Sequence, residues 1–74
     1  MTNLEMQRRL RGWSQEALAT KLAFTQPMIS YVEAGRFTPD NISPALKHAL
    51  EEEFEKPIEW LLTEVAEGGN YAVS

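Results

Sequence analysis

Cysteine is absent from this 74-residue chain, so no disulfide can hold its fold together. A reducing, cytoplasmic setting is therefore expected. No apolar run approaches the roughly 18 residues that a membrane span needs, and the first residues lack the basic and then apolar pattern of a secretion signal. These absences, with a hydrophobic content of 43%, indicate one small domain that folds around a single core.

The parts of a catalytic or metal site are also missing. His48 is the only histidine, and without cysteine the chain offers neither a catalytic triad nor a set of zinc ligands. His48 and Glu52 have helical spacing, but we expect a solvated surface pair there. Gly68-Gly69 is a lone doublet that does not resemble a phosphate loop. We therefore expect no enzymatic activity and no cofactor.

Basic charge is scarce, since the net charge is -4 and the pI is near 4.8. Nucleic-acid-binding domains usually show the opposite balance. Residues 1–50 hold six basic and four acidic side chains, a net of +2, whereas residues 51–74 hold one basic and seven acidic, a net of -6. If these parts form opposite poles, the first can face phosphate while the second faces away. Alternatively, the acidic segment is only a solvated face.

Capping signals predict three short helices in the first half of the chain. Thr2 and Glu5 have the form of a capping box that opens a helix ending near Gly12, with Leu4 and Leu10 inward and Met6 a further candidate. Ser14 and Thr25 cap the next two helices. Each of these two caps lies between a staple pair, Trp13 with Leu18 and Phe24 with Ile29, and Gly35 ends the third helix.

Two further helices are predicted in the second half. Ser43 caps the fourth, with Pro44 in its first turn, and the fifth begins near Pro57. Residues 66–74 have no periodicity and are expected to be a flexible tail or linker. Apolar residues at helical spacing form the expected core of this half: Leu46, Ala49, Leu50, Phe54, Ile58, Leu61 and Leu62. With no strand signal and no repeat, the sequence predicts an all-α bundle of five helices.

The second and third predicted helices and their tight turn resemble the helix-turn-helix of the Cro and phage-repressor (XRE) type. The resemblance covers roughly residues 4–62 and implies an all-α, lambda-repressor-like DNA-binding domain at residues 1–65. Small Ala19 would face the crossing point of the two helices. The segments that carry the resemblance are Gly12-Trp-Ser-Gln-Glu-Ala-Leu-Ala, Thr25-Gln-Pro-Met-Ile-Ser-Tyr-Val-Glu-Ala-Gly, Arg36 with Pro39, and Pro57-Ile-Glu-Trp-Leu-Leu.

The resemblance also implies roles for single residues. Gln26 opens the recognition helix and would read a base edge, because a glutamine amide can donate and accept at once. Its neighbours on the outward stripe would touch adjacent bases: Pro27, Ser30, Tyr31 and, as a further candidate, Met28. Positions implied to contact phosphate are Ser14, Gln15, Thr25, Arg11 and Arg36, with Gln15 also bracing Gln26. For Ser14 and Thr25 plain capping is the other role, and for the two arginines it is simple solvation.

Arg8 and Glu33 correspond to a family ion pair that ties the first helix to the recognition helix, although Arg9 could take this role after a one-residue shift. The chain departs from the family pattern at three positions. Ala23 stands where a turn glycine is usual, Pro27 biases Gln26 away from helical angles, and Gln7 replaces an apolar residue.

The expected function is sequence-specific binding of double-stranded DNA by a transcriptional regulator, most simply a repressor. A homodimer on two-fold related half-sites is expected, because one recognition helix covers few base pairs. The fifth helix with Trp60, together with Phe37, is the candidate dimer interface. Two alternatives remain open. One is a protein-interaction module of the same fold, such as an antitoxin or adapter that uses its acidic end, and the other is the DNA-reading end of a longer regulator.

Overall fold

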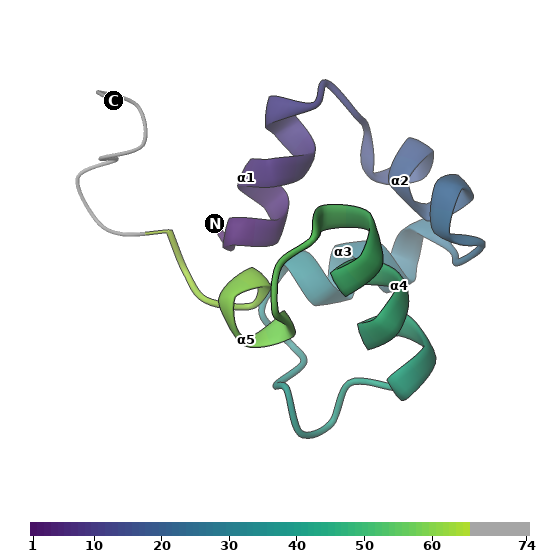
Figure 1. The fold of residues 1–74 in the computed structure, drawn as a ribbon. Coiled ribbons are helices and arrows are strands. Elements are labelled where there is room, and N and C mark those ends of the chain that lie inside the picture. Colours follow the sequence, from purple (N-terminus) through teal and green to yellow (C-terminus); the bar gives the residue numbers. More distant parts are fainter. Residues whose placement is uncertain (66–74) are drawn as a thin grey trace.

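The computed structural model describes residues 1–65, which form five α-helices joined by short loops (Figure 1). Apart from one isolated antiparallel bridge between Thr2 and Glu64, these residues contain no strand. The predicted all-α architecture is confirmed, while the predicted tail lies outside the described residues. The helices are α1 (Asn3–Leu10), α2 (Gln15–Leu22), α3 (Gln26–Glu33), α4 (Pro44–Phe54) and α5 (Ile58–Leu61).

None of the helices in this part of the chain has the length and apolar content needed to cross a membrane.

Each of the first four helices begins directly after the hydroxyl residue that the sequence predicts as its cap. The side-chain oxygen accepts a hydrogen bond from the backbone N–H three residues further on, which would otherwise be unpaired in the first turn. Such a cap stabilises a helix by about 1 kcal/mol. The caps and their donor–acceptor distances are Thr2 (3.2 Å), Ser14 (2.9 Å), Thr25 (3.4 Å) and Ser43 (3.3 Å).

The ends of α1, α2 and α3 share one geometry. In each, a residue with positive φ follows the last helical turn, and the next N–H bonds back to a carbonyl five residues earlier. Gly12 (φ 74°) and Gly35 (φ 78°) take this conformation without steric cost. Ala23 takes it at φ 62° despite its side chain. The turn between α2 and α3 is therefore the strained one of the three.

One predicted core residue of α1 is not in the core. Leu4 is fully buried and Met6 nearly so, but Leu10 is 69% exposed. The helix α5 packs on the first part of α1, where the Asn3 amide donates to the Trp60 carbonyl at 2.9 Å. The helix α1 ends at Leu10, and this end of the helix points away from α5 (Figure 1). The prediction for Leu10 was wrong because helical spacing identifies a face but not how far along the axis its partner extends.

Most of the remaining apolar core follows the prediction, but Ala49 and Leu62 are only half-buried, and the buried Ile42 was not predicted. Residues from all five helices and from the loop before α4 meet in one cluster. The inner faces of α2 and α3 therefore share one core with α4 and α5. Half-buried aromatic residues pack around it, including Trp13 and Trp60. The buried members are Leu4, Leu18, Ala19, Ile29, Val32, Ile42, Leu46, Leu50, Phe54, Ile58 and Leu61.

Candidate nucleic-acid interface

The helices α2 and α3 pack tightly against each other across the turn at Ala23. Ala19 is 2% exposed at the crossing, and its small side chain permits the close approach that the sequence predicts. Ile29 and Val32 anchor the inner side of α3 with no exposed surface. Burying a side chain of this size contributes roughly 1.5–3 kcal/mol. The orientation of α3 is therefore set by the core rather than by its surface residues.

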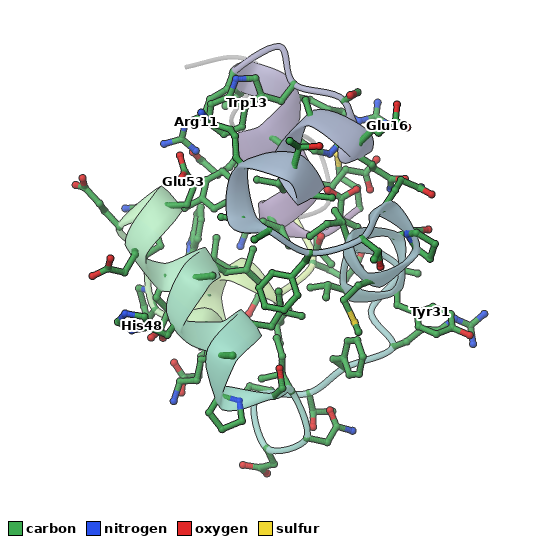
Figure 2. All side chains as sticks on the ribbon, turned by 90° about the vertical axis from the view of Figure 1, so that its right-hand side faces the viewer. Arg11, Trp13, Glu16, Tyr31, His48 and Glu53 are labelled. Carbon is green, nitrogen blue, oxygen red and sulfur yellow. The ribbon has the colours of Figure 1, made fainter. Side chains whose placement is uncertain are left out.

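The outer edge of α3 is polar and accessible. Gln26, Pro27 and Tyr31 are exposed and Ser30 is partly so, at the i, i+4 spacing that places them side by side on one stripe. Figure 2 shows Tyr31 pointing away from the body of the domain. Met28 instead packs against the core. Residues Gln26, Pro27, Ser30 and Tyr31 are called the α3 edge below.

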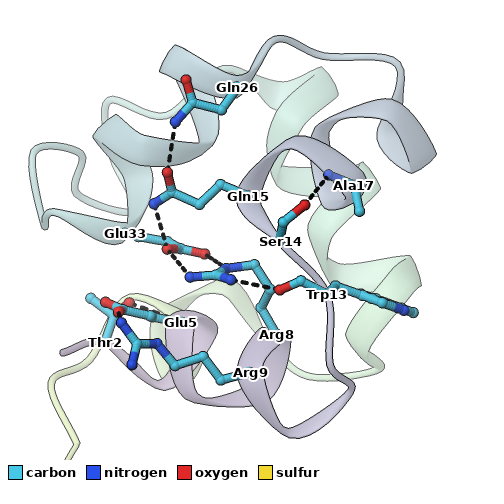
Figure 3. A network of polar contacts seen from close by, with 10 residues as sticks. All are labelled: Thr2, Glu5, Arg8, Arg9, Trp13, Ser14, Gln15, Ala17, Gln26 and Glu33. Carbon is cyan, nitrogen blue, oxygen red and sulfur yellow. Dashed lines mark hydrogen bonds and ion pairs between the residues drawn. The ribbon is translucent and has the colours of Figure 1, made fainter.

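A chain of hydrogen bonds runs inward from the first residue of this edge (Figure 3). The Gln26 amide nitrogen donates to the Gln15 side-chain oxygen at 2.7 Å. The Gln15 amide nitrogen in turn donates to Glu33 Oε1 at 2.9 Å. Gln15 therefore braces Gln26, and it connects the surface of α3 to a buried carboxylate.

That carboxylate belongs to a buried ion pair. Arg8 Nε donates to Glu33 Oε2 at 2.6 Å and Nη2 donates to Oε1 at 3.1 Å, with side-chain exposures of 9% and 2%. Arg8 also donates from Nη1 to the Trp13 carbonyl at 2.6 Å, which ties the loop after α1 to the same group. Arg9 pairs with Glu5 at 2.6 Å on the surface of α1, so the one-residue shift does not occur.

The candidate phosphate contacts fall into two groups. Ser14 and Thr25 are exposed at the N-termini of α2 and α3, where free N–H groups and the helix dipole favour anions. Arg36 lies over the Tyr31 ring at 5.6 Å, beside the α3 edge. Arg11, which is also a candidate phosphate contact, lies elsewhere. Its guanidinium lies 4.5 Å from the Phe54 ring, and Figure 2 shows it on the opposite side from Tyr31.

The effects of the departures from the family pattern are visible in the geometry. Ala23 adopts the left-handed conformation that a glycine would take more easily. Gln26 is nevertheless the first residue of α3, because Thr25 before it is extended and Pro27 occupies the first turn, where its missing N–H is not needed. Gln7 is half-buried on α1.

Acidic side chains gather on a different side of the domain from the α3 edge. Figure 2 shows His48 and Glu53 on the opposite side of the molecule from Tyr31. A shallow hollow there is lined by His48, Glu51, Glu52 and Glu55. His48 and Glu52 are both exposed and 3.8 Å apart. Within residues 1–65 no group of three or more potential ligands could hold a metal ion.

Sequence reasoning missed two features of these surfaces. Glu51 Oε2 accepts the Ile58 N–H at 2.7 Å, so a residue of α4 caps α5, whose own N-cap Pro57 makes no side-chain bond. Glu16 lines a hollow with Ser14 at the start of α2, and Figure 2 places it on the same half as Tyr31. The first depends on the tertiary packing of α4 on α5. The place of Glu16 beside Ser14 could have been predicted, because Glu16 follows this cap by two residues.

Two closely packed helices with a tight turn and an outward polar edge define a helix-turn-helix protein. The comparison with protein families agrees, since the helix-turn-helix model HTH_3 matches residues 4–61. The chain belongs to this Cro/C1-type (XRE) helix-turn-helix family, which is a family of DNA-binding regulators. No curated protein and no solved structure matches the chain.

Proposed function

We propose that this protein is a sequence-specific transcriptional repressor that binds double-stranded operator DNA as a homodimer, in the cytoplasm. The observation that carries the proposal is the state of Gln26. Its side chain is exposed at the start of α3, yet its amide is held by Gln15 at 2.7 Å. A reading group that is accessible and already oriented loses little freedom on binding.

The α3 edge has the chemistry to read base pairs in the major groove. The Gln26 amide can donate to N7 and accept from N6 of an adenine. Ser30 can bond to a neighbouring base, and the ring faces of Pro27 and Tyr31 can contact a thymine methyl group. These side chains project from one rigid helix, so they would read adjacent base pairs in a fixed register.

Phosphate contacts on both sides would position this helix. Ser14 and Thr25 are exposed at the N-termini of α2 and α3, and Gln15, which follows Ser14, is bonded to Gln26. Arg36 lies beside Tyr31 at the other end of the edge. Such contacts fix orientation but carry no sequence information. Arg11 stacks on the Phe54 ring instead and is not one of the proposed phosphate contacts.

The charge distribution supports this orientation despite the net charge of -4. His48 and Glu53 of α4 lie across the molecule from Tyr31 (Figure 2), so phosphate repulsion by the acidic helix is weakened by distance and by salt. Glu16 is the exception, because it lies on the α3 side. Binding is therefore expected to be weaker than for a basic domain and to depend on the base contacts.

A homodimer is proposed because one recognition helix covers too few base pairs for useful specificity. The proposed interface is α5 with Trp60, whose ring is half-buried against the core and so keeps one part accessible. Phe37 is half-buried too, but it packs edge-on against Tyr31 at 6.4 Å, which places it beside the DNA-reading edge. Sedimentation of wild type and Trp60→Ala tests the interface, with a shift to monomer expected.

Selection from random DNA duplexes tests the base-reading role. Wild type is expected to enrich a two-fold related site, and Gln26→Ala is expected to lose preference at one position in each half-site. The matched control is Gln7→Ala, which replaces a half-buried glutamine of α1 that is not part of the α3 edge. A wild-type protein that enriches no sequence would refute the proposal, as would a Gln26→Ala variant with an unchanged preference.

The acidic side of α4 favours a second function, that of a protein-interaction module such as an antitoxin or adapter. The hollow lined by His48, Glu51, Glu52 and Glu55 would then meet a basic partner. Replacing Glu52 and Glu55 with glutamine should abolish partner capture in a pull-down, whereas Gln26→Ala should leave it intact. The operator hypothesis predicts the reverse dependence for DNA.

A further inference from the structure

We propose that the buried Arg8–Glu33 ion pair sets, through Gln15, the donor–acceptor order that Gln26 presents to a base pair. Arg8 and Glu33 would thus be positioning residues that act on base preference from inside the domain. Because this role is exerted through Gln26, it rests on the proposed function. The juxtaposition that carries it is the continuous run of hydrogen bonds from Arg8 to Gln26 (Figure 3).

The direction of this run follows from the chemistry of its inner end. A carboxylate accepts hydrogen bonds and cannot donate them. Glu33 already accepts two bonds from Arg8, so the group that Gln15 turns toward it must be the amide N–H₂, as the 2.9 Å contact shows. The amide oxygen of Gln15 then faces the other way, toward Gln26.

The same constraint passes on to Gln26. Facing an oxygen, Gln26 must turn its amide nitrogen toward Gln15, and the contact is 2.7 Å. What remains free on Gln26 is the carbonyl oxygen and the second N–H, in a fixed order along the α3 edge. An isolated glutamine amide has no such preference, because the terminal torsion has two nearly equivalent settings.

A fixed order matters because base pairs present ordered patterns in the major groove. Adenine shows an acceptor at N7 beside a donor at N6, and the other three base-pair orientations present different sequences of groups. A fixed amide matches one of these patterns and opposes the reversed one. An amide that is free to turn over accepts both, so base discrimination at that position falls even though the reading residue is unchanged.

The test uses two variants that leave Gln26 in place. The combined substitution Arg8→Met with Glu33→Gln removes both charges, so no unpaired charge is left buried. It puts an amide at residue 33 that can either donate or accept. Gln15→Met breaks the run further out and keeps the ion pair. The matched control is Arg9→Met with Glu5→Gln, which removes the surface pair of the same helix.

Selection from random duplexes, with folding checked by circular dichroism, gives the readout. Gln26→Ala first identifies the base-pair position that Gln26 reads, where wild type is expected to discriminate about 5- to 150-fold. The double variant of Arg8 and Glu33 and the Gln15→Met variant should both lower this discrimination to less than about threefold. Preferences at neighbouring positions should remain, since lost phosphate contacts carry no sequence information. The control variant should match wild type at every position.

Two results would overturn the inference. One is an unchanged preference at the Gln26 position in the folded Arg8 and Glu33 double variant, or in Gln15→Met. The other is an equal loss at all positions, which would mean that the ion pair only supports the fold. Both differ from failure of the proposed function, in which wild type itself enriches no sequence.

Discussion

The strained turn between α2 and α3 gives the sharpest stability prediction, made by replacing Ala23 with glycine. Ala23 is exposed and has φ 62° and ψ 37°, a left-handed conformation that costs a residue with a side chain roughly 1–2 kcal/mol. Glycine removes this cost but gains freedom in the unfolded chain, which offsets about 0.5–1 kcal/mol. Taken at the middle of both ranges, these two terms predict that Ala23→Gly stabilises the domain by about 0.5–1 kcal/mol.

Thermal unfolding followed by circular dichroism measures the change. For a domain of this size 1 kcal/mol corresponds to about 4–8 °C, so Tm should rise by about 2–8 °C. Ala34→Gly is the matched control, because Ala34 is also exposed at a helix end but has φ -77°. It should lower Tm by a similar amount, since glycine adds only unfolded-state entropy there. Equal changes in the two variants, or a lower Tm for Ala23→Gly, would refute the assignment of strain.

Three further predictions concern the core, the ion pair and the salt response. Leu50→Ala should destabilise the domain by about 2–5 kcal/mol in urea unfolding, whereas exposed Leu10→Ala should change it by less than about 0.5 kcal/mol. Glu33→Gln strands the Arg8 charge and should cost about 3–5 kcal/mol by the same assay, against less than about 1 kcal/mol for Glu5→Gln in its more exposed pair. If each subunit neutralises about three phosphates, fluorescence anisotropy should show log affinity falling with log salt at a slope near -5 for the dimer, and a flat response would contradict DNA binding.

The elements of this fold are legible in the sequence because their boundaries are local. Ser14, Thr25 and Ser43 each bond to a backbone N–H three residues away, so the cap and its partner lie in one short window. Gly12 and Gly35 mark helix ends for the same reason. The helical spacing of apolar residues then identifies which face of each helix turns inward, as with Leu46 and Leu50 in α4.

Features that depend on where helices meet could not be predicted from the sequence. The exposure of Leu10 depends on the extent of α5 along α1. The bond from Glu51 to Ile58, the contact of Asn3 with Trp60 and the stacking of Arg11 on Phe54 each join residues from different elements. A single sequence gives the type of each side chain but not these distances.

The candidate site could be predicted from the sequence only in part. The exposure of Gln26 follows from its place at the start of a capped helix, whereas its link to Gln15 and the Arg8–Glu33 pair entered only through the family resemblance. The bond from Gln15 to Glu33, which joins the two into one run, had no sequence signal. It requires α2 to cross α3 at the close distance that Ala19 allows.

The most direct test of the α3 edge as the DNA-reading surface is an amide NMR titration with the selected duplex. The largest shift changes should fall on Gln26, Ser30 and Tyr31 and on the first turn of α2, with the amides of His48 to Glu55 little affected. Changes centred on the acidic side of α4, with the first turn of α3 unperturbed, would contradict the account.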